Sequence, residues 1–144
     1  MQHKGVIELK PSNFQLINKP RITKSIFQVN KDYNFSTEVL LEIDKNTKVS
    51  ETFGEEMAAI VVLSLEFFQG KDFKEIPFKL EMEIEGIFKW DEELENNPSQ
   101  LEVLLKENAP AILYSYLRPI ITSISIEANL PPLVIPLMNF RERN

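Results

Sequence analysis

Residues 78–88 read FKLEMEIEGIF, a run in which apolar and charged side chains alternate. The apolar positions are Phe78, Leu80, Met82, Ile84 and Phe88, and the positions between them include Lys79, Glu81, Glu83 and Glu85. Successive side chains of a strand point to opposite faces of a sheet. The alternation therefore predicts a half-buried strand with one apolar face and one acidic face.

Two further strands are predicted on the N-terminal side of this run. Residues 33–44 alternate in the same way and predict a second half-buried strand, with apolar positions at Tyr33, Phe35, Val39, Leu41 and Ile43. Residues 57–68 are apolar at nearly every position in their first half, which indicates a central strand or a strand covered on both faces. Residues 69–72 supply a turn towards the strand at 78–88, so we expect an antiparallel hairpin there.

The ends of the first half carry weaker signals. Residues 6–17 predict a strand at an edge or a bulge, because Pro11 has no amide to donate to a ladder. Residues 44–56 are polar, include Gly54, and are interpreted as a connecting loop. The first half is thus expected to contain strands alone.

Helical signals follow Trp90. Asn97 is a suitable N-cap, Pro98 suits the first helical position, and Gln100 completes a pattern like a capping box. A short helix with an apolar stripe is predicted there, the stripe consisting of Leu101, Leu104 and Leu105.

A longer helix is predicted from near Asn108 and Pro110 towards Ala128. Asn129 suits the left-handed conformation that ends many helices. Pro119 lies inside this helix, where it removes an amide donor, so we expect a kink. Apolar side chains extend so far around the helix that one sheet cannot cover them, which predicts an oligomer. The expected interface residues are Ile112, Leu113, Tyr116, Leu117, Ile120, Ile121 and Ile124.

Four strands followed by helices favour an α+β fold with an antiparallel sheet. A chain of 144 residues has the length of a single domain, so we expect one domain over residues 1–144. No apolar stretch reaches membrane-spanning length, and residues 1–10 have no apolar run behind their charges. We therefore expect a cytoplasmic protein.

The residues that most enzymes require are missing or scattered. The chain has no cysteine, and its one histidine is His3, near a terminus. The glycines Gly5, Gly54, Gly70 and Gly86 are too dispersed for a phosphate-binding loop. With 22 acidic and 16 basic side chains the net charge is −6, which disfavours nucleic acid as a partner. We expect no enzymatic activity, no cofactor and no metal.

Three features have both a structural and a functional interpretation. Glu81, Glu83 and Glu85 share a strand face and could approach a calcium ion, but a solvated face is favoured because no carbonyl-rich loop accompanies them. Trp90 is either a binding platform or, preferably, a core residue. Residues 130–137 read LPPLVIPL, and three prolines exclude a regular helix, so this segment either covers the core or lines a groove.

The second half of the chain resembles the SecB family of export chaperones, which are homotetramers. The resemblance lies in GIF at residues 86–88, APAILYSYLR at 109–118, LPPL at 130–133 and PLMNF at 136–140, in the same order and spacing. The first half agrees only in its strand pattern. The resemblance implies four antiparallel strands per subunit, with long helices packed between dimers in a dimer of dimers.

The resemblance also implies a client-binding groove between the sheet and a crossover at residues 130–137. The expected groove residues are Phe88, Trp90, Leu130, Leu133, Val134, Ile135, Leu137 and Phe140. Apolar burial is non-directional, so such a groove holds many sequences without nucleotide energy.

The family also presents an acidic sheet face to the SecA motor, for which Glu81, Glu83 and Glu85 are the candidates. Glu81 keeps an acidic residue, but Pro11, Gln15 and Lys79 fall where the rest of the docking surface is expected, which argues against SecA as a partner. SecB also continues past its Asn-Phe pair into a further helix and tail, whereas the sequence here stops at Asn144.

Three functions are compatible with these observations. The favoured one is an ATP-independent holdase for unfolded polypeptides, with a possible role in protein export. The second is a dedicated binder of one partner on a SecB-like scaffold, such as an antitoxin chaperone. The third is an oligomer whose own side chains close its grooves.

Overall fold

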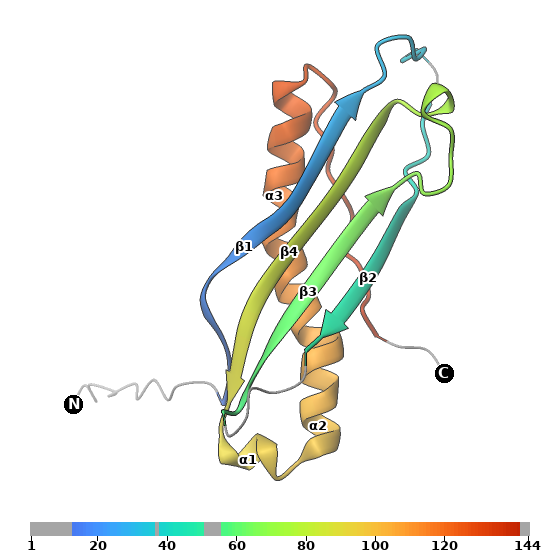
Figure 1. Cartoon of the computed structure of the whole chain (residues 1–144). Coiled ribbons are helices and arrows are strands. Elements are labelled where there is room, and N and C mark those ends of the chain that lie inside the picture. The colour runs from blue at the N-terminus through green and yellow to red at the C-terminus, as the bar shows by residue number, and fades with distance from the viewer. Residues whose placement is uncertain (1–12, 37, 51–55, 142–144) are drawn as a thin grey trace, which may run out of the picture.

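The computed structural model describes residues 13–36, 38–50 and 56–141. These residues form a four-stranded sheet in the order β1-β4-β3-β2, with antiparallel pairing throughout. The strands are β1 (Phe14–Val29), β2 (Ile43–Val49), β3 (Ala58–Phe67) and β4 (Phe78–Trp90). A short 3-10 helix, η1 (Phe73–Glu75), lies between β3 and β4. The α-helices follow the strands along the chain, and the longest one lies across one face of the sheet (Figure 1). The predicted α+β fold is therefore confirmed.

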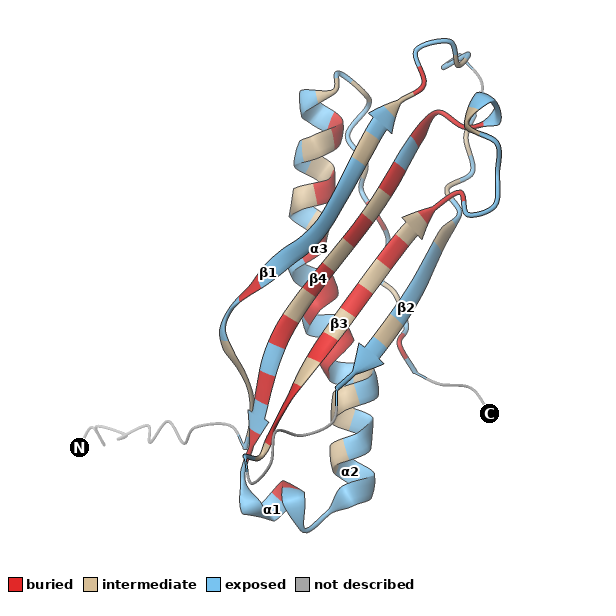
Figure 2. Cartoon of the chain, viewed as in Figure 1, coloured by how far each residue is buried: buried red, intermediate tan, exposed pale blue. Residues whose placement is uncertain are grey.

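The hairpin of β3 and β4 is the centre of the sheet, as the sequence predicts. Leu65 pairs with Met82 and Leu63 with Ile84, and these side chains are buried on the face towards the helix. Buried positions alternate with more exposed ones along β4 (Figure 2). The predicted turn is present, with Gly70 at φ 77°, a left-handed conformation that glycine adopts without strain.

The N-terminal strand is longer than predicted. Of the predicted range 6–17, residues 6–12, with Pro11, lie outside the described part of the chain, and β1 instead runs from Phe14 to Val29 beside β4. Its register against β4 shifts between Ile17 and Arg21 and again between Ile22 and Lys24. The first shift inserts two extra residues into β1 and keeps the faces, whereas the second inserts one and exchanges the side chains between the two faces. The alternation in this stretch is therefore broken, which is why the sequence pattern does not show the strand.

The predicted strand at residues 33–44 is wrong in nearly all its length. Residues 31–36 and 38–42 form turns and irregular backbone, and β2 begins only at Ile43 and runs to Val49, mostly within the segment 44–56 predicted to be a loop. The alternation instead reflects Val39 and Leu41, which pack on the core from irregular backbone. β2 itself is an edge strand with polar residues on both faces, so it has no apolar signal.

Four helical segments follow β4: α1 (Glu92–Glu95), α2 (Pro98–Val103), a π-helical turn η2 (Leu104–Asn108) and α3 (Ala109–Glu127). Asn97 caps α2 as predicted, accepting a hydrogen bond from the Gln100 amide. Asn129 follows α3 at φ 57°, also as predicted. α3 is a single element through Pro119, and the kink expected there stays a prediction. None of the helices in the described residues is long and apolar enough to cross a membrane.

α3 packs on the inner face of the sheet, where Leu113, Leu117 and Ile121 are fully buried. Gly86 in β4 permits this close approach. A Cβ atom at Gly86 would stand 3.0 Å from Leu113 Cδ2 and 2.7 Å from Leu16 Cδ1. Glycine is thus used here for space between the helix and the sheet.

Candidate functional site

The segment after α3 turns back along the helix and is here called the strap, residues 130–140. It has no helix or strand, and it runs beside α3 in the direction opposite to the helix (Figure 1). At its far end the Lys45 ammonium of β2 donates a hydrogen bond to the Asn139 carbonyl and lies 4.4 Å from the centre of the Phe140 ring. The strap therefore links the end of α3 to the edge of the sheet.

A stripe of polar side chains on α3 holds the strap by its backbone. The Tyr114 hydroxyl donates to the Pro136 carbonyl, and Arg118 Nε donates to the Ile135 carbonyl at 3.2 Å. Burial raises the pKa of the Tyr114 hydroxyl, which keeps the donor protonated, while nearby Arg118 partly offsets the rise.

One turn further along α3, Thr122 Oγ1 donates to the Leu133 carbonyl at 2.6 Å. These donors are four residues apart along α3 and so lie on one face of the helix. All three bond the strap backbone, so the bonds place no requirement on the side chains that the strap presents to solvent.

The strap covers the core with some side chains and exposes others. Ile135 and Phe140 are buried, and Leu130 and Leu133 are half-buried and pack against the core. Val134 and Leu137, by contrast, are 75% and 81% exposed. The interpretation of LPPLVIPL as a segment that covers the core is thus confirmed, and other side chains of the same segment are exposed.

A cavity of about 280 Å³ opens beside the start of the strap and is here called the strap pocket. Its strap wall consists of Leu130, Pro131 and Leu133, and its floor consists of Pro77 and Phe78 at the start of β4. Its third wall comes from the irregular segment before β2 and consists of Phe35, Val39 and Leu41. Every lining residue is apolar, so the pocket suits an apolar side chain.

Several predicted groove residues lie elsewhere. Phe88 and Trp90 are buried in the core, and the Trp90 indole donates to Glu95 Oε2 at 2.5 Å, so neither side chain is available as a groove surface. Sequence reasoning missed the floor and the third wall of the strap pocket. The alternation at residues 33–44 contains the signal for that wall, but the same alternation predicts a strand.

The predicted interface residues divide into two sets. Leu113, Leu117 and Ile121 are core residues, because the chain's own sheet covers them completely. Their assignment to an oligomer interface is therefore corrected. Ile112 and Tyr116 are more than a third exposed.

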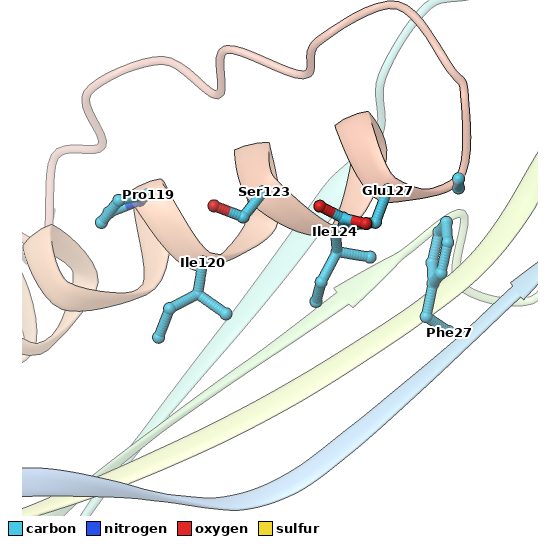
Figure 3. Close-up of a pocket in the computed structure, with 7 residues that line it drawn as sticks. Phe27, Pro119, Ile120, Ser123, Ile124 and Glu127 are labelled. Carbon is cyan, nitrogen blue, oxygen red and sulfur yellow. The ribbon is translucent and has the colours of Figure 1, made fainter.

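Ile120 and Ile124 line an open trough of about 540 Å³ between α3 and Phe27 of β1. In Figure 3 both isoleucines point from the helix towards the strands, with Phe27 rising from β1 near Glu127. This trough and the exposed side chains of Ile112, Tyr116 and Ile126 are apolar parts of the helix surface that the subunit itself leaves open.

The acidic residues of β4 are half-buried on the outer face of the sheet and are partly neutralised by β1. Lys24 Nζ lies 2.9 Å from Glu81 Oε2, and Arg21 Nε lies 2.5 Å from Glu85 Oε1. The hydrogen bond between Lys24 and Glu81 raises the pKa of the lysine and lowers that of the carboxyl. In the described part of the chain no group of three His, Cys, Asp or Glu side chains could hold a metal ion.

Solved structures with the same fold are known. A SecB-like chaperone of Mycobacterium tuberculosis, solved with a ChAD peptide from the HigA1 antitoxin, superposes with a TM-score of 0.68 at 15% identity, over 91% of this chain and 94% of that one. A Streptococcus agalactiae protein of unknown function superposes with a TM-score of 0.52 at 14% identity, over 87% and 99% of the two chains.

Sequence comparison finds relatives in both archaea and bacteria. An uncharacterized protein of Methanocaldococcus jannaschii is 29% identical over 101 residues, which span 70% of this chain and 63% of that relative. The protein-export protein SecB of Anaplasma phagocytophilum is 25% identical over 138 residues, spanning 92% and 83% of the two chains. The family model for preprotein translocase subunit SecB matches residues 11–142. Since that match covers almost the whole length, the chain belongs to the SecB family.

Proposed function

We propose that this protein is an ATP-independent, non-enzymatic chaperone that binds unfolded polypeptides along the strap. The observation that carries the proposal is the strap pocket, with its wholly apolar lining, beside the exposed side chains of Val134 and Leu137. Exposed apolar side chains grouped around an apolar cavity are typical of interaction sites. Membership of the SecB family supports a chaperone function.

The dimensions favour an extended segment over a folded partner. A cavity of about 280 Å³ lies near the lower end of small-ligand sites, which span about 300–1,000 Å³, so it accepts one or two side chains. Fully burying a large apolar side chain contributes about 1.5–3 kcal/mol. A client thus needs several such contacts, which an unfolded chain supplies by lying along the strap.

A test is the aggregation of an unfolded precursor diluted with and without the protein, followed by light scattering. The proposal predicts suppression at a ratio near one oligomer per client. Scattering that is unchanged by a well-formed oligomer would contradict a general holdase.

The second candidate is a chaperone dedicated to one partner. It is favoured by the structure of the M. tuberculosis relative, which was solved with a peptide from an antitoxin. Affinity purification separates the two, because a dedicated binder recovers one protein in fixed stoichiometry and a general holdase recovers many. Failure of the native protein to bind a hydrophobic dye would instead indicate that its own side chains close the groove.

We also propose that a second copy of the chain covers the helix trough, as in a dimer of dimers. The trough between α3 and β1 is open and apolar, with Ile120 and Ile124 partly exposed. Ile124→Asp would place a charge in that contact, and we expect a smaller mass by size-exclusion chromatography with static scattering. An unchanged mass would contradict this assembly.

Of the functions of the SecB family, export through SecA has the least support in this chain. The ion pairs with Arg21 and Lys24 reduce the negative charge that Glu85 and Glu81 present on the outer sheet face. We therefore propose a cytoplasmic chaperone that does not rely on this face to recruit SecA. Binding of purified SecA that is abolished by Glu81→Lys would contradict this.

A further inference from the structure

Two polar side chains are buried beside the segments that form the strap pocket. Apart from aromatic residues, Asn30 and Ser125 are the buried polar side chains of the described residues, at 5% and 0% exposure. A buried polar group is costly unless it is hydrogen-bonded. Neither side chain bonds the ladder of the sheet, and both bond the segments that form the strap pocket.

Asn30 binds the floor of the pocket. Its side-chain amide donates to the carbonyls of Phe73 and Ile76, both at 3.0 Å, and its backbone amide donates to the Pro77 carbonyl at 2.9 Å. These bonds join the end of β1 to residues more than forty positions later in the chain. They fix the backbone that leads directly into Pro77 and Phe78.

The same residue starts the segment that forms the third wall. Asn30 Oδ1 accepts a hydrogen bond from the Asp32 amide at 3.1 Å, and the Asn30 carbonyl accepts one from the Tyr33 amide at 3.2 Å. This turn directs the chain towards Phe35 and Val39. One buried side chain therefore sets the position of two walls relative to each other.

Ser125 holds the remaining wall. Its hydroxyl accepts a hydrogen bond from the Leu133 amide at 2.9 Å and donates to the Thr122 carbonyl at 2.7 Å. Its own carbonyl accepts a hydrogen bond from the Leu130 amide at 3.0 Å. Both ends of the strap wall are thus bound to one residue of α3.

We infer that Asn30 and Ser125 are positioning residues of the strap pocket, which hold its three walls at the separation that accepts an apolar side chain. The inference rests on the proposed function in one respect, because it assumes that this apolar side chain belongs to a bound polypeptide. Two networks from distant parts of the sequence meet at one cavity. Loss of either network should widen the pocket without removing any residue that lines it.

The binding test uses two peptides of about ten residues that differ at one position. One carries a phenylalanine among glycine and serine residues, and its twin carries serine in that place. In the wild type the phenylalanine peptide should bind at least about tenfold more tightly, equivalent to about 1.4 kcal/mol. We expect this ratio to fall towards one in Asn30→Ala and in Ser125→Ala.

The double variant tests whether the two residues act on the same cavity. Because either change already opens the pocket, the double variant should lose little more than either single one.

Val61→Ala is the matched control for a general loss of stability. Val61 is fully buried in β3 and pairs with Gly86, which lies eight residues along β4 from Phe78, or about 26 Å. The Val61→Ala change should lower the free energy of unfolding. At temperatures well below the unfolding transition it should leave the ratio of the two peptide affinities unchanged.

A second measurement is independent of any client. The chain has no cysteine, so spin labels can be placed on Leu40→Cys and Val134→Cys alone. These positions are 81% and 75% exposed and adjoin the third wall and the strap wall, respectively. The labelled chain is co-refolded with an excess of wild type, so that only distances within one chain are measured. We expect a narrow distance distribution that broadens in Asn30→Ala and Ser125→Ala but not in Val61→Ala.

The outcomes separate the two proposals. If the wild type binds both peptides equally but the distances still broaden, the pocket is positioned as inferred and the proposed function fails. If the peptide ratio and the distances are both unchanged in the two variants, the positioning inference is wrong. Should Asn30→Ala not fold, Ser125→Ala still decides the question, because it acts on a different wall.

Discussion

The exposed side chains of the strap allow stability and client binding to be separated. Val134 and Leu137 are 75% and 81% exposed in the free chain, so folding gains little from them. We therefore expect Val134→Ser with Leu137→Ser to change the free energy of unfolding by no more than about 0.5 kcal/mol per site. The same two side chains would be buried when a client lies along the strap.

The expected loss of affinity follows from that burial. Full burial of a valine or leucine side chain contributes about 1.5–3 kcal/mol, and a client on one side covers about half of each. The double variant should therefore lose about 1.5–3 kcal/mol of binding free energy, which raises Kd by about 10- to 150-fold. Fluorescence anisotropy of a labelled unfolded fragment measures the Kd, and denaturant unfolding followed by Trp90 emission measures the stability.

Val103→Ser is the control for a general loss of surface hydrophobicity. Val103 is 48% exposed at the end of α2 and does not line the strap pocket. It should change neither the Kd nor the stability by a measurable amount. A double strap variant that keeps wild-type affinity would refute the strap as the client surface, and an equal loss in Val103→Ser would mean that clients bind any exposed apolar residue.

Three further predictions concern the packing and charges that support the site. Gly86→Ala should cost about 1–3 kcal/mol of stability by overpacking against Leu113, measured by denaturant unfolding. Thr122→Val removes the bond to the strap backbone with little change of shape, so it should cost about 0.5–1.5 kcal/mol and weaken client binding. Lys24 lowers the pKa of Glu81, so the ion pair stabilises the folded state. This stabilisation is present above the pKa of the carboxyl in the unfolded chain and is lost as the pH falls through its pKa in the folded chain. The free energy of unfolding of Lys24→Met, measured by denaturant unfolding, should therefore differ from that of the wild type most near neutral pH and least in acid. A difference that stays the same across that pH range would contradict a stabilising role of the ion pair.

The sequence predicts the parts of the fold where one face is buried and the register is continuous. β4 alternates without interruption, so its pattern predicts both the strand and its buried face. The same reasoning does not detect β1, because two register shifts interrupt its pattern and the one between Ile22 and Lys24 exchanges the faces. β2 escapes because an edge strand with the composition IDKNTKV has no apolar face to detect.

The candidate site was predictable only where it follows from local chain chemistry. Three prolines exclude a helix from the strap, so its extended course follows from the sequence. The pocket beside the strap is formed by three segments that meet only in the folded chain. One of these segments contains Val39 and Leu41, and the sequence alternation at these two residues is the same whether the backbone is a strand or irregular. The resemblance to SecB implies that Phe88 and Trp90 line the groove, and residue type alone does not decide this because aromatic residues suit both cores and binding surfaces.

The hydrogen bonds that hold the strap separate its course along the chain from its specificity for clients. Tyr114, Arg118, Thr122 and Ser125 bond backbone atoms of the strap, so the course of the strap depends on α3 and on the buried Ile135. The outward side chains contribute little to that course and are free to vary. Exchanging Val134 for a charged residue should therefore change which clients bind while the fold and the strap geometry persist, whereas changes on the α3 stripe should weaken the binding of all clients together.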